Sequence, residues 1–102
     1  MDLFDQQVER NLKGIELEKT GEIDKAIQLY ELNIAEDFTG SHPYNRLAII
    51  YSRRKQVANE IRVLNRAIQV FSSLDPESRM DVNTKLEKFK KRWKKANNKN
   101  ST

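Results

Sequence analysis

The stretch that decides the fold is residues 14–34, GIELEKTGEIDKAIQLYELNI. Moved along the chain by 34 residues, it matches residues 48–68, AIIYSRRKQVANEIRVLNRAI. The corresponding positions carry residues of similar character, namely Gly14 and Ala48, Leu17 and Tyr51, Ile23 and Val57, Ile27 and Ile61, Tyr30 and Leu64, and Ile34 and Ile68. Such a period, with apolar residues three and four apart, is typical of a stacked helix-turn-helix unit. We therefore expect two units, over about residues 7–40 and 41–74.

Gly14 stands inside an expected helix, although glycine there costs about 1 kcal/mol relative to alanine. Its counterpart Ala48 is also small. A small residue in the first helix of a pair allows the second helix to approach closely, which compensates for the weak helix propensity. We therefore expect the helices of each pair to pack tightly at these two positions.

Outward from this stretch, the sequence predicts helix nearly throughout, because it has 3 Gly and 2 Pro and no segment that alternates like a strand. The first expected helix covers residues 3–19, and Gly21 follows it as a left-handed C-terminal cap. Its apolar residues lie four, four and three apart, at Phe4, Val8, Leu12 and Ile15.

Four further helices are expected after the first. They cover residues 23–36, 41–55, 57–71 and about 76–96. Ser41 is the expected N-cap of the third helix, with Pro43 in its first turn, and Asp75 before Pro76 marks the start of the fifth. The apolar face of the fifth helix is Val82, Leu86, Phe89 and Trp93. We expect one domain over residues 1–96 and a disordered tail over 97–102.

Composition excludes several classes of function. The chain has no cysteine and one histidine, so disulfides and thiolate metal sites are excluded and we expect no metal. Its glycines are too dispersed to form a phosphate-binding loop, so we expect no cofactor. Asp37, Ser41 and His42 lie too close together in sequence to align as a catalytic triad, and we expect no enzymatic activity.

No stretch approaches the run of about 20 apolar residues that a membrane span requires. The N-terminal sequence MDLFDQQ lacks the basic and apolar regions of a secretion signal. We therefore expect a cytoplasmic protein without a membrane partner.

At the paired positions above, the chain resembles the tetratricopeptide repeat family. The first unit matches the family pattern at Gly14, Leu17, Gly21, Ile23, Ala26 and Tyr30, and the second at Tyr44, Leu47, Ala48, Tyr51, Leu64 and Ala67. The resemblance implies a right-handed superhelical array of about five helices, in which the fifth caps the array. Asn33, Lys55 and Glu60 depart from the family pattern, and we expect them to loosen the packing.

Tetratricopeptide arrays bind peptides along a concave face lined by the first helix of each pair. The resemblance implies a peptide groove formed by Asn11, Ile15, Lys19, Asn45, Ile49, Ser52, Arg53, Arg79 and Asn83. Asparagine amides can both donate to and accept from a peptide backbone, and arginine can hold a carboxylate with two parallel hydrogen bonds. The implied function is a noncovalent protein-binding adaptor or regulator; the alternative is that these residues are ordinary exposed polar positions.

The segment 85–95 holds seven basic residues and one acidic residue. If its aromatic residues are buried, a cationic ridge remains outside, formed by Lys88, Lys91, Arg92 and Lys95. Such a ridge can bind acidic proteins or the phosphates of nucleic acid, and a nucleic-acid-associated protein is the alternative function. A solvated capping helix explains the same residues without a ligand.

Charge is distributed unevenly along the chain. Residues 1–40 carry ten acidic and four basic residues, a net charge of −6, whereas residues 41–102 carry five acidic and fifteen basic residues, a net charge of +10. Leu3, Phe4 and Val8 also exceed what the first helix pair can bury. We therefore expect an acidic protein or peptide partner, and a homodimer in which the first helix of one copy approaches the last helix of the other. The alternative is a monomer in which the fifth helix folds back over the exposed apolar residues of the first.

Overall fold

The computed structural model describes residues 1–100. Its helices are α1 (Leu3–Lys19), α2 (Ile23–Ala35), α3 (His42–Arg53), α4 (Val57–Ser72) and α5 (Val82–Asn100). This part of the chain contains no strand, which confirms the expected all-α class. Within it, no helix is both long and apolar enough to cross a membrane.

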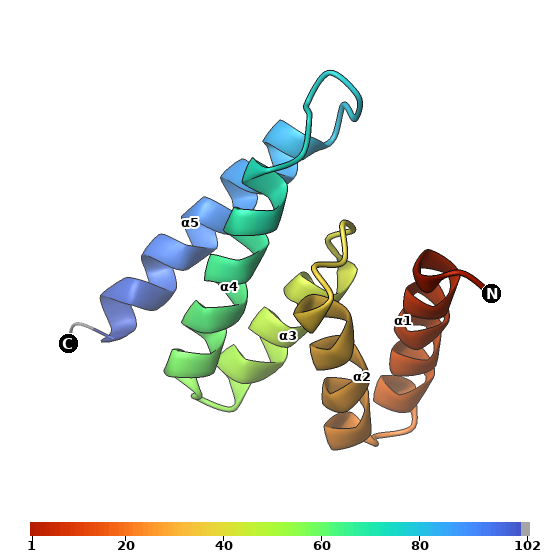
Figure 1. Cartoon of the computed structure of the whole chain (residues 1–102). Coiled ribbons are helices and arrows are strands. Elements are labelled where there is room, and N and C mark those ends of the chain that lie inside the picture. The colour runs from red at the N-terminus through yellow and green to blue at the C-terminus, as the bar shows by residue number, and fades with distance from the viewer. Residues whose placement is uncertain (101–102) are drawn as a thin grey trace.

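Helices that follow one another in sequence pack side by side, with α1 and α5 at the two ends of the row (Figure 1). Three aromatic rings join α3, α4 and α5. The ring centroid of Tyr44 lies 6.4 Å from that of Phe71 and 6.2 Å from that of Phe89, and Phe71 and Phe89 are 5.3 Å apart. All three side chains are at most 1% exposed, so this cluster fixes α5 against the α3–α4 pair.

Both helix pairs turn through the same backbone conformation. Gly21 has a φ of 81° and Lys55, at the corresponding position, has a φ of 59°. In each turn the next N–H donates to the carbonyl five residues before it, over 2.8 Å after Gly21 and 2.9 Å after Lys55. The 34-residue register is therefore present in the backbone. Lys55 keeps the turn intact rather than loosening it, although a left-handed conformation is unfavourable for a residue with a Cβ.

The ring of Tyr30 in α2 lies directly against Gly14 in α1. A Cβ added at Gly14 would stand 2.6 Å from Cζ of Tyr30, closer than packed atoms can approach. Tyr30 is fully buried, and its hydroxyl donates to Glu18 over 2.7 Å, so the ring cannot move aside. The contact at Gly14 is therefore tight, as expected, but it is made by an aromatic side chain and not by the backbone of the second helix.

α1 packs on α2 through a largely polar face. The residues that α1 buries are Gln7, Asn11, Gly14 and Leu17. Asn33 of α2 is fully buried and donates from Nδ2 to the Gln7 carbonyl over 2.8 Å and to Oδ1 of Asn11 over 2.9 Å. Its own Oδ1 accepts from Arg10 over 3.1 Å. Asn33 therefore joins the two helices, and the expectation that it loosens their packing is wrong.

α5 begins at Val82, later than expected from Asp75 and Pro76. Asp75 does start a turn, because its carboxylate accepts from the Glu77 N–H over 2.9 Å and from the Ser78 hydroxyl over 2.8 Å. This turn does not extend into a helix, since the following residues lead back toward the first unit.

The C-terminal end of α5 also differs from the expectation. Residues 97–100 belong to the helix, so the expected disordered tail over 97–102 is wrong for these residues, and 101–102 lie outside the described part of the chain. Ala96 is fully buried, and Nζ of Lys99 lies 3.1 Å from Oγ of Ser52 in α3. These contacts extend the helix by holding its last turn against α3.

Ser41 precedes α3 but does not cap it as expected. Its side chain makes no capping hydrogen bond, because its backbone angles, φ −80° and ψ −19°, are already helical. Pro43 lies in the first turn, as the sequence predicts.

The Gly14 contact can be tested by adding a side chain there. We expect Gly14→Leu to lower the free energy of unfolding by at least about 1–3 kcal/mol, because overpacking alone costs that much. Lys13→Leu places the same side chain at the exposed neighbouring position and should change stability by less than about 0.5 kcal/mol. Urea denaturation measures both, and equal stabilities of the two variants would contradict the contact.

The strained turn gives a second test. Lys55→Gly should raise the free energy of unfolding by up to about 1 kcal/mol, since glycine avoids a left-handed penalty of about 1–2 kcal/mol but loses more backbone entropy on folding. The reciprocal control Gly21→Lys should lower stability by a similar amount. Thermal melting of both variants provides the measurement, and a stabilised Gly21→Lys variant would refute the strain argument.

The third test concerns Asn33. Asn33→Ala leaves buried polar groups of α1 without partners, so we expect it to destabilise the fold by about 1–3 kcal/mol. Asn65→Ala, an exposed change on α4, serves as the matched control and should have little effect. If calorimetry shows the two variants to be equally stable, Asn33 does not hold α1.

Candidate functional site

A groove of about 350 Å³ lies between α3 and α5. Its lining residues are Ala48, Ile49, Ser52, Arg53, Glu60, Arg92, Lys95 and Lys99. The sequence predicts Ile49, Ser52 and Arg53 as groove residues and Arg92 and Lys95 as part of a basic ridge. The structure brings the two sets together in one place, which we call the cationic groove.

α5 runs alongside α3 in the same direction. Nη1 of Arg92 donates to Oδ1 of Asn45 over 3.1 Å, and Nζ of Lys99 donates to Oγ of Ser52 over 3.1 Å. The partners in both pairs are 47 residues apart. α3 ends 34 residues after α1, whereas α5 ends 47 residues after α3, so the last helix does not keep the 34-residue spacing.

This shift removes Arg79 and Asn83 from the site predicted for them. Arg79 lies in the α4–α5 connection, where it donates to the Thr39 carbonyl over 2.6 Å and pairs with Asp81 over 2.8 Å. Its guanidinium carbon also lies 5.7 Å from the ring centroid of Phe71, so Arg79 anchors this connection. Asn83 is exposed near the start of α5 and does not line the cationic groove.

Glu60 of α4 is the functional candidate that sequence reasoning missed. It is 7% exposed, and its carboxylate lies 3.5 Å from Nζ of Lys99. The available signal is the charge of Glu60 at a position where the repeat pattern has alanine. From sequence, that departure predicts only looser packing. Glu60 instead places one negative charge at the buried side of the cationic groove.

Four cations of α5 lie along one side of the helix because they are three and four residues apart. They are Lys88, Arg92, Lys95 and Lys99. Lys91, also expected in the ridge, lies three residues after Lys88 and four before Lys95, but it is not among the residues that line the groove. Lys90, by contrast, is rotated about 140° from Lys95 and about 160° from Arg92, so it lies on the opposite side of the helix. Neither Arg53 nor Lys95 forms an ion pair within residues 1–100, so both are available to an anionic ligand.

The groove residues expected in α1 do not join this site. Asn11 is buried and hydrogen-bonded to Asn33, so the expectation that it faces a ligand is wrong. Ile15 is half-buried, and Lys19 is exposed 3.8 Å from Glu16. The site is therefore formed by the second unit and α5 alone.

A buried polar network connects the first unit to α3. The carboxylate of Glu18 accepts from the Tyr30 hydroxyl over 2.7 Å and from two nitrogens of Arg46, the shorter distance being 2.6 Å. Burial opposes ionisation of Glu18, but the hydrogen bonds from Arg46 and Tyr30 outweigh it and lower the pKa of this carboxyl. Burial, and then the hydrogen bond to Glu18, raise the pKa of Tyr30.

His42 belongs to the same network. Its Nε2 lies 3.3 Å from the Tyr30 hydroxyl, the two rings meet edge to face, and burial lowers the pKa of His42. Asp37 pairs instead with Arg66 over 2.7 Å. The histidine therefore packs against Tyr30 rather than facing Asp37.

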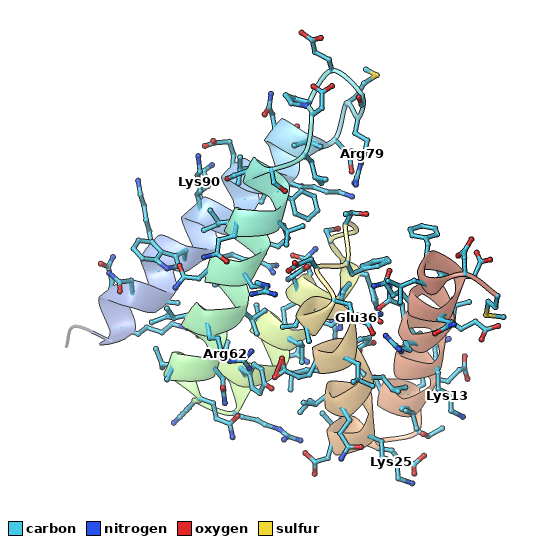
Figure 2. The ribbon with its side chains drawn as sticks, viewed as in Figure 1. Lys13, Lys25, Glu36, Arg62, Arg79 and Lys90 are labelled. Atoms are coloured by element: carbon cyan, nitrogen blue, oxygen red, sulfur yellow. The ribbon has the colours of Figure 1, made fainter. Side chains whose placement is uncertain are left out.

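A larger groove of about 800 Å³ lies between α2 and α4. Arg62, labelled in Figure 2, reaches from α4 to Glu31 over 2.6 Å, and Arg66 pairs with Asp37 over 2.7 Å. The charged groups of this groove therefore already have partners. These pairs neutralise part of the charge asymmetry within the molecule. The cationic groove, with Arg53 and Lys95 unpaired, is therefore the stronger candidate site.

No protein-family model, curated protein or solved structure matches the chain. The case for a function therefore depends on the geometry of the cationic groove and on the residues that carry the tetratricopeptide resemblance.

Proposed function

We propose that the chain is a noncovalent protein-binding module that holds an acidic peptide segment in the cationic groove. We also propose that its helix pairs stack in a right-handed superhelical array like that of tetratricopeptide proteins, which the equivalent turns at Gly21 and Lys55 support. The observation that carries the function is the convergence of cations from α3 and α5 on one groove.

The groove offers a different contact to each part of such a peptide. Arg53 and Lys95 bind acidic side chains, and the guanidinium of Arg53 can take a carboxylate with two hydrogen bonds. The Ser52 hydroxyl lines the groove and can bond the peptide backbone, whereas Asn45 lies outside the lining, where its Oδ1 accepts from Arg92. Ile49 is half-buried and supplies an apolar contact.

Glu60 restricts where the acidic groups of the peptide can sit. Its carboxylate occupies the buried side of the groove and is held there by Lys99. A second carboxylate placed beside it would be repelled, so the acidic side chains of the ligand align along the outer edge, near Lys95 and Arg53. The groove therefore selects a row of spaced acidic groups rather than one deeply inserted anion.

Nucleic acid is the second candidate, because α5 carries a cationic row that extends beyond the groove. Phosphate binding would draw on all exposed cations of α5, including Lys90, which lies on the side of the helix opposite the groove. Peptide binding in the groove depends on Lys95 and not on Lys90. The two lysines therefore form a matched pair that separates the two functions.

Fluorescence anisotropy with two labelled probes tests this proposal. The first probe is a peptide of alternating Glu and Leu, and the second is a single-stranded DNA of equal length. Lys95→Glu should weaken peptide binding by about 10-fold or more, corresponding to about 1.4 kcal/mol, whereas Lys90→Glu should change it less than about 3-fold. Three results together would favour nucleic acid and contradict the peptide function. Both substitutions would lower affinity equally, the parent would bind DNA more tightly than the peptide, and the logarithm of the DNA affinity would fall steeply and linearly with the logarithm of salt concentration.

A further inference from the structure

α1 presents an apolar face to solvent. Phe4 is 56% exposed and Leu12 is 59% exposed, while Val8 and Ile15 on the same side are half-buried. We call these four residues the α1 stripe. They stay outside because α1 turns its polar face, with Asn11, inward to α2. An exposed row of large apolar residues on a helix is a surface suited to burial against a partner.

A row of acidic residues flanks the α1 stripe. Asp5, Glu9 and Glu16 lie four and seven residues apart, so they share one side of the helix, next to Leu12. All three are exposed. α1 is thus an amphipathic helix whose exposed edge carries the negative charge that the cationic groove is proposed to bind.

The two surfaces complement each other in charge and spacing. Acidic side chains on α1 repeat at one and two helical turns, and the cations on the groove side of α5 repeat at about one turn. Resting on the proposed function, we propose that the ligand of the cationic groove is α1 of a second copy of this chain. The acidic row lies along Lys88 and Lys95, and the apolar α1 stripe covers Ile49 of α3.

The two surfaces lie at opposite ends of the molecule, with α1 at one end and α5 at the other (Figure 1). Two copies related by a twofold axis can therefore each insert α1 into the other's groove, which gives a closed dimer with two equal contacts. Figure 2 shows Lys90 on α5 and Lys13 on α1 at these two ends. Because the dimer fills both grooves, an acidic peptide must compete with self-association.

Charge reversal tests this contact directly. The acid-reversed variant carries Glu9→Lys and Glu16→Lys, and the base-reversed variant carries Lys88→Glu and Lys95→Glu; all four positions are exposed. Light scattering coupled to size exclusion should show the parent rising above its monomer mass of 12.0 kDa as concentration increases. Each reversed variant alone should stay at the monomer mass, because like charges then face each other in both contacts.

An equimolar mixture of the two variants should form a dimer of about 24 kDa, since one contact is native and the other is reversed on both sides. A parent that stays monomeric at every concentration, reversed variants that still associate alone, or a mixture that fails to associate would each overturn the proposal. Circular dichroism confirms that each variant is folded, and a chain carrying all four reversals should associate with itself like the parent.

A separate variant distinguishes failure of this inference from failure of the proposed function. Phe4→Ser with Leu12→Ser changes the α1 stripe, which lies outside the cationic groove, and also removes the stacking of Phe4 on Phe38. We expect this variant to be monomeric and to bind the Glu-Leu probe peptide at least as tightly as the parent, because its grooves are open. If the variant is monomeric but does not bind the probe, the proposed peptide function is contradicted, while the role of α1 in self-association is supported. If the variant still dimerises, only the inference about α1 is overturned.

Discussion

The contact between Gly14 and the ring of Tyr30 sets the rotation of α1, and the arrangement of the other surfaces depends on it. With no side chain at position 14, the Tyr30 ring seats on α1 and directs its hydroxyl to Glu18, which also binds Arg46 of α3. The same rotation turns Asn11 inward to Asn33. The apolar face of α1 consequently stays outside, while α3, α4 and α5 form their own aromatic core at the other end of the chain.

Local signals were sufficient to predict most of the fold. Apolar spacing located all the helices of the described chain, and glycine placed the turn at Gly21, because both signals act over a few residues. The boundaries of α5 could not be obtained in this way. Asp75 followed by Pro76 has the local signature of a helix start, but the actual path depends on the distant bond from Arg79 to the Thr39 carbonyl.

The candidate site was predictable only in part. The sequence predicts both Arg53 and Lys95 as site residues. It does not predict that they line the same groove, because α5 does not follow the 34-residue period. Asn11 and Glu60 show the other limit. Whether a polar side chain faces solvent or a buried partner depends on the rotation of its helix, and a single apolar period does not determine that rotation when the buried face, as in α1, is itself polar.

The rotation of α1 is therefore the claim to test most directly, and the absence of cysteine from the chain makes this simple. Two single-cysteine variants, Leu12→Cys and Leu17→Cys, make the same change on opposite sides of α1, where the native leucines are 59% and 8% exposed. Thiol labelling rates should be measured in solution dilute enough to keep the chain monomeric. The structure requires Cys at position 12 to react nearly as fast as in unfolded protein and Cys at position 17 to be strongly protected; protection at 12 with rapid labelling at 17 would contradict it.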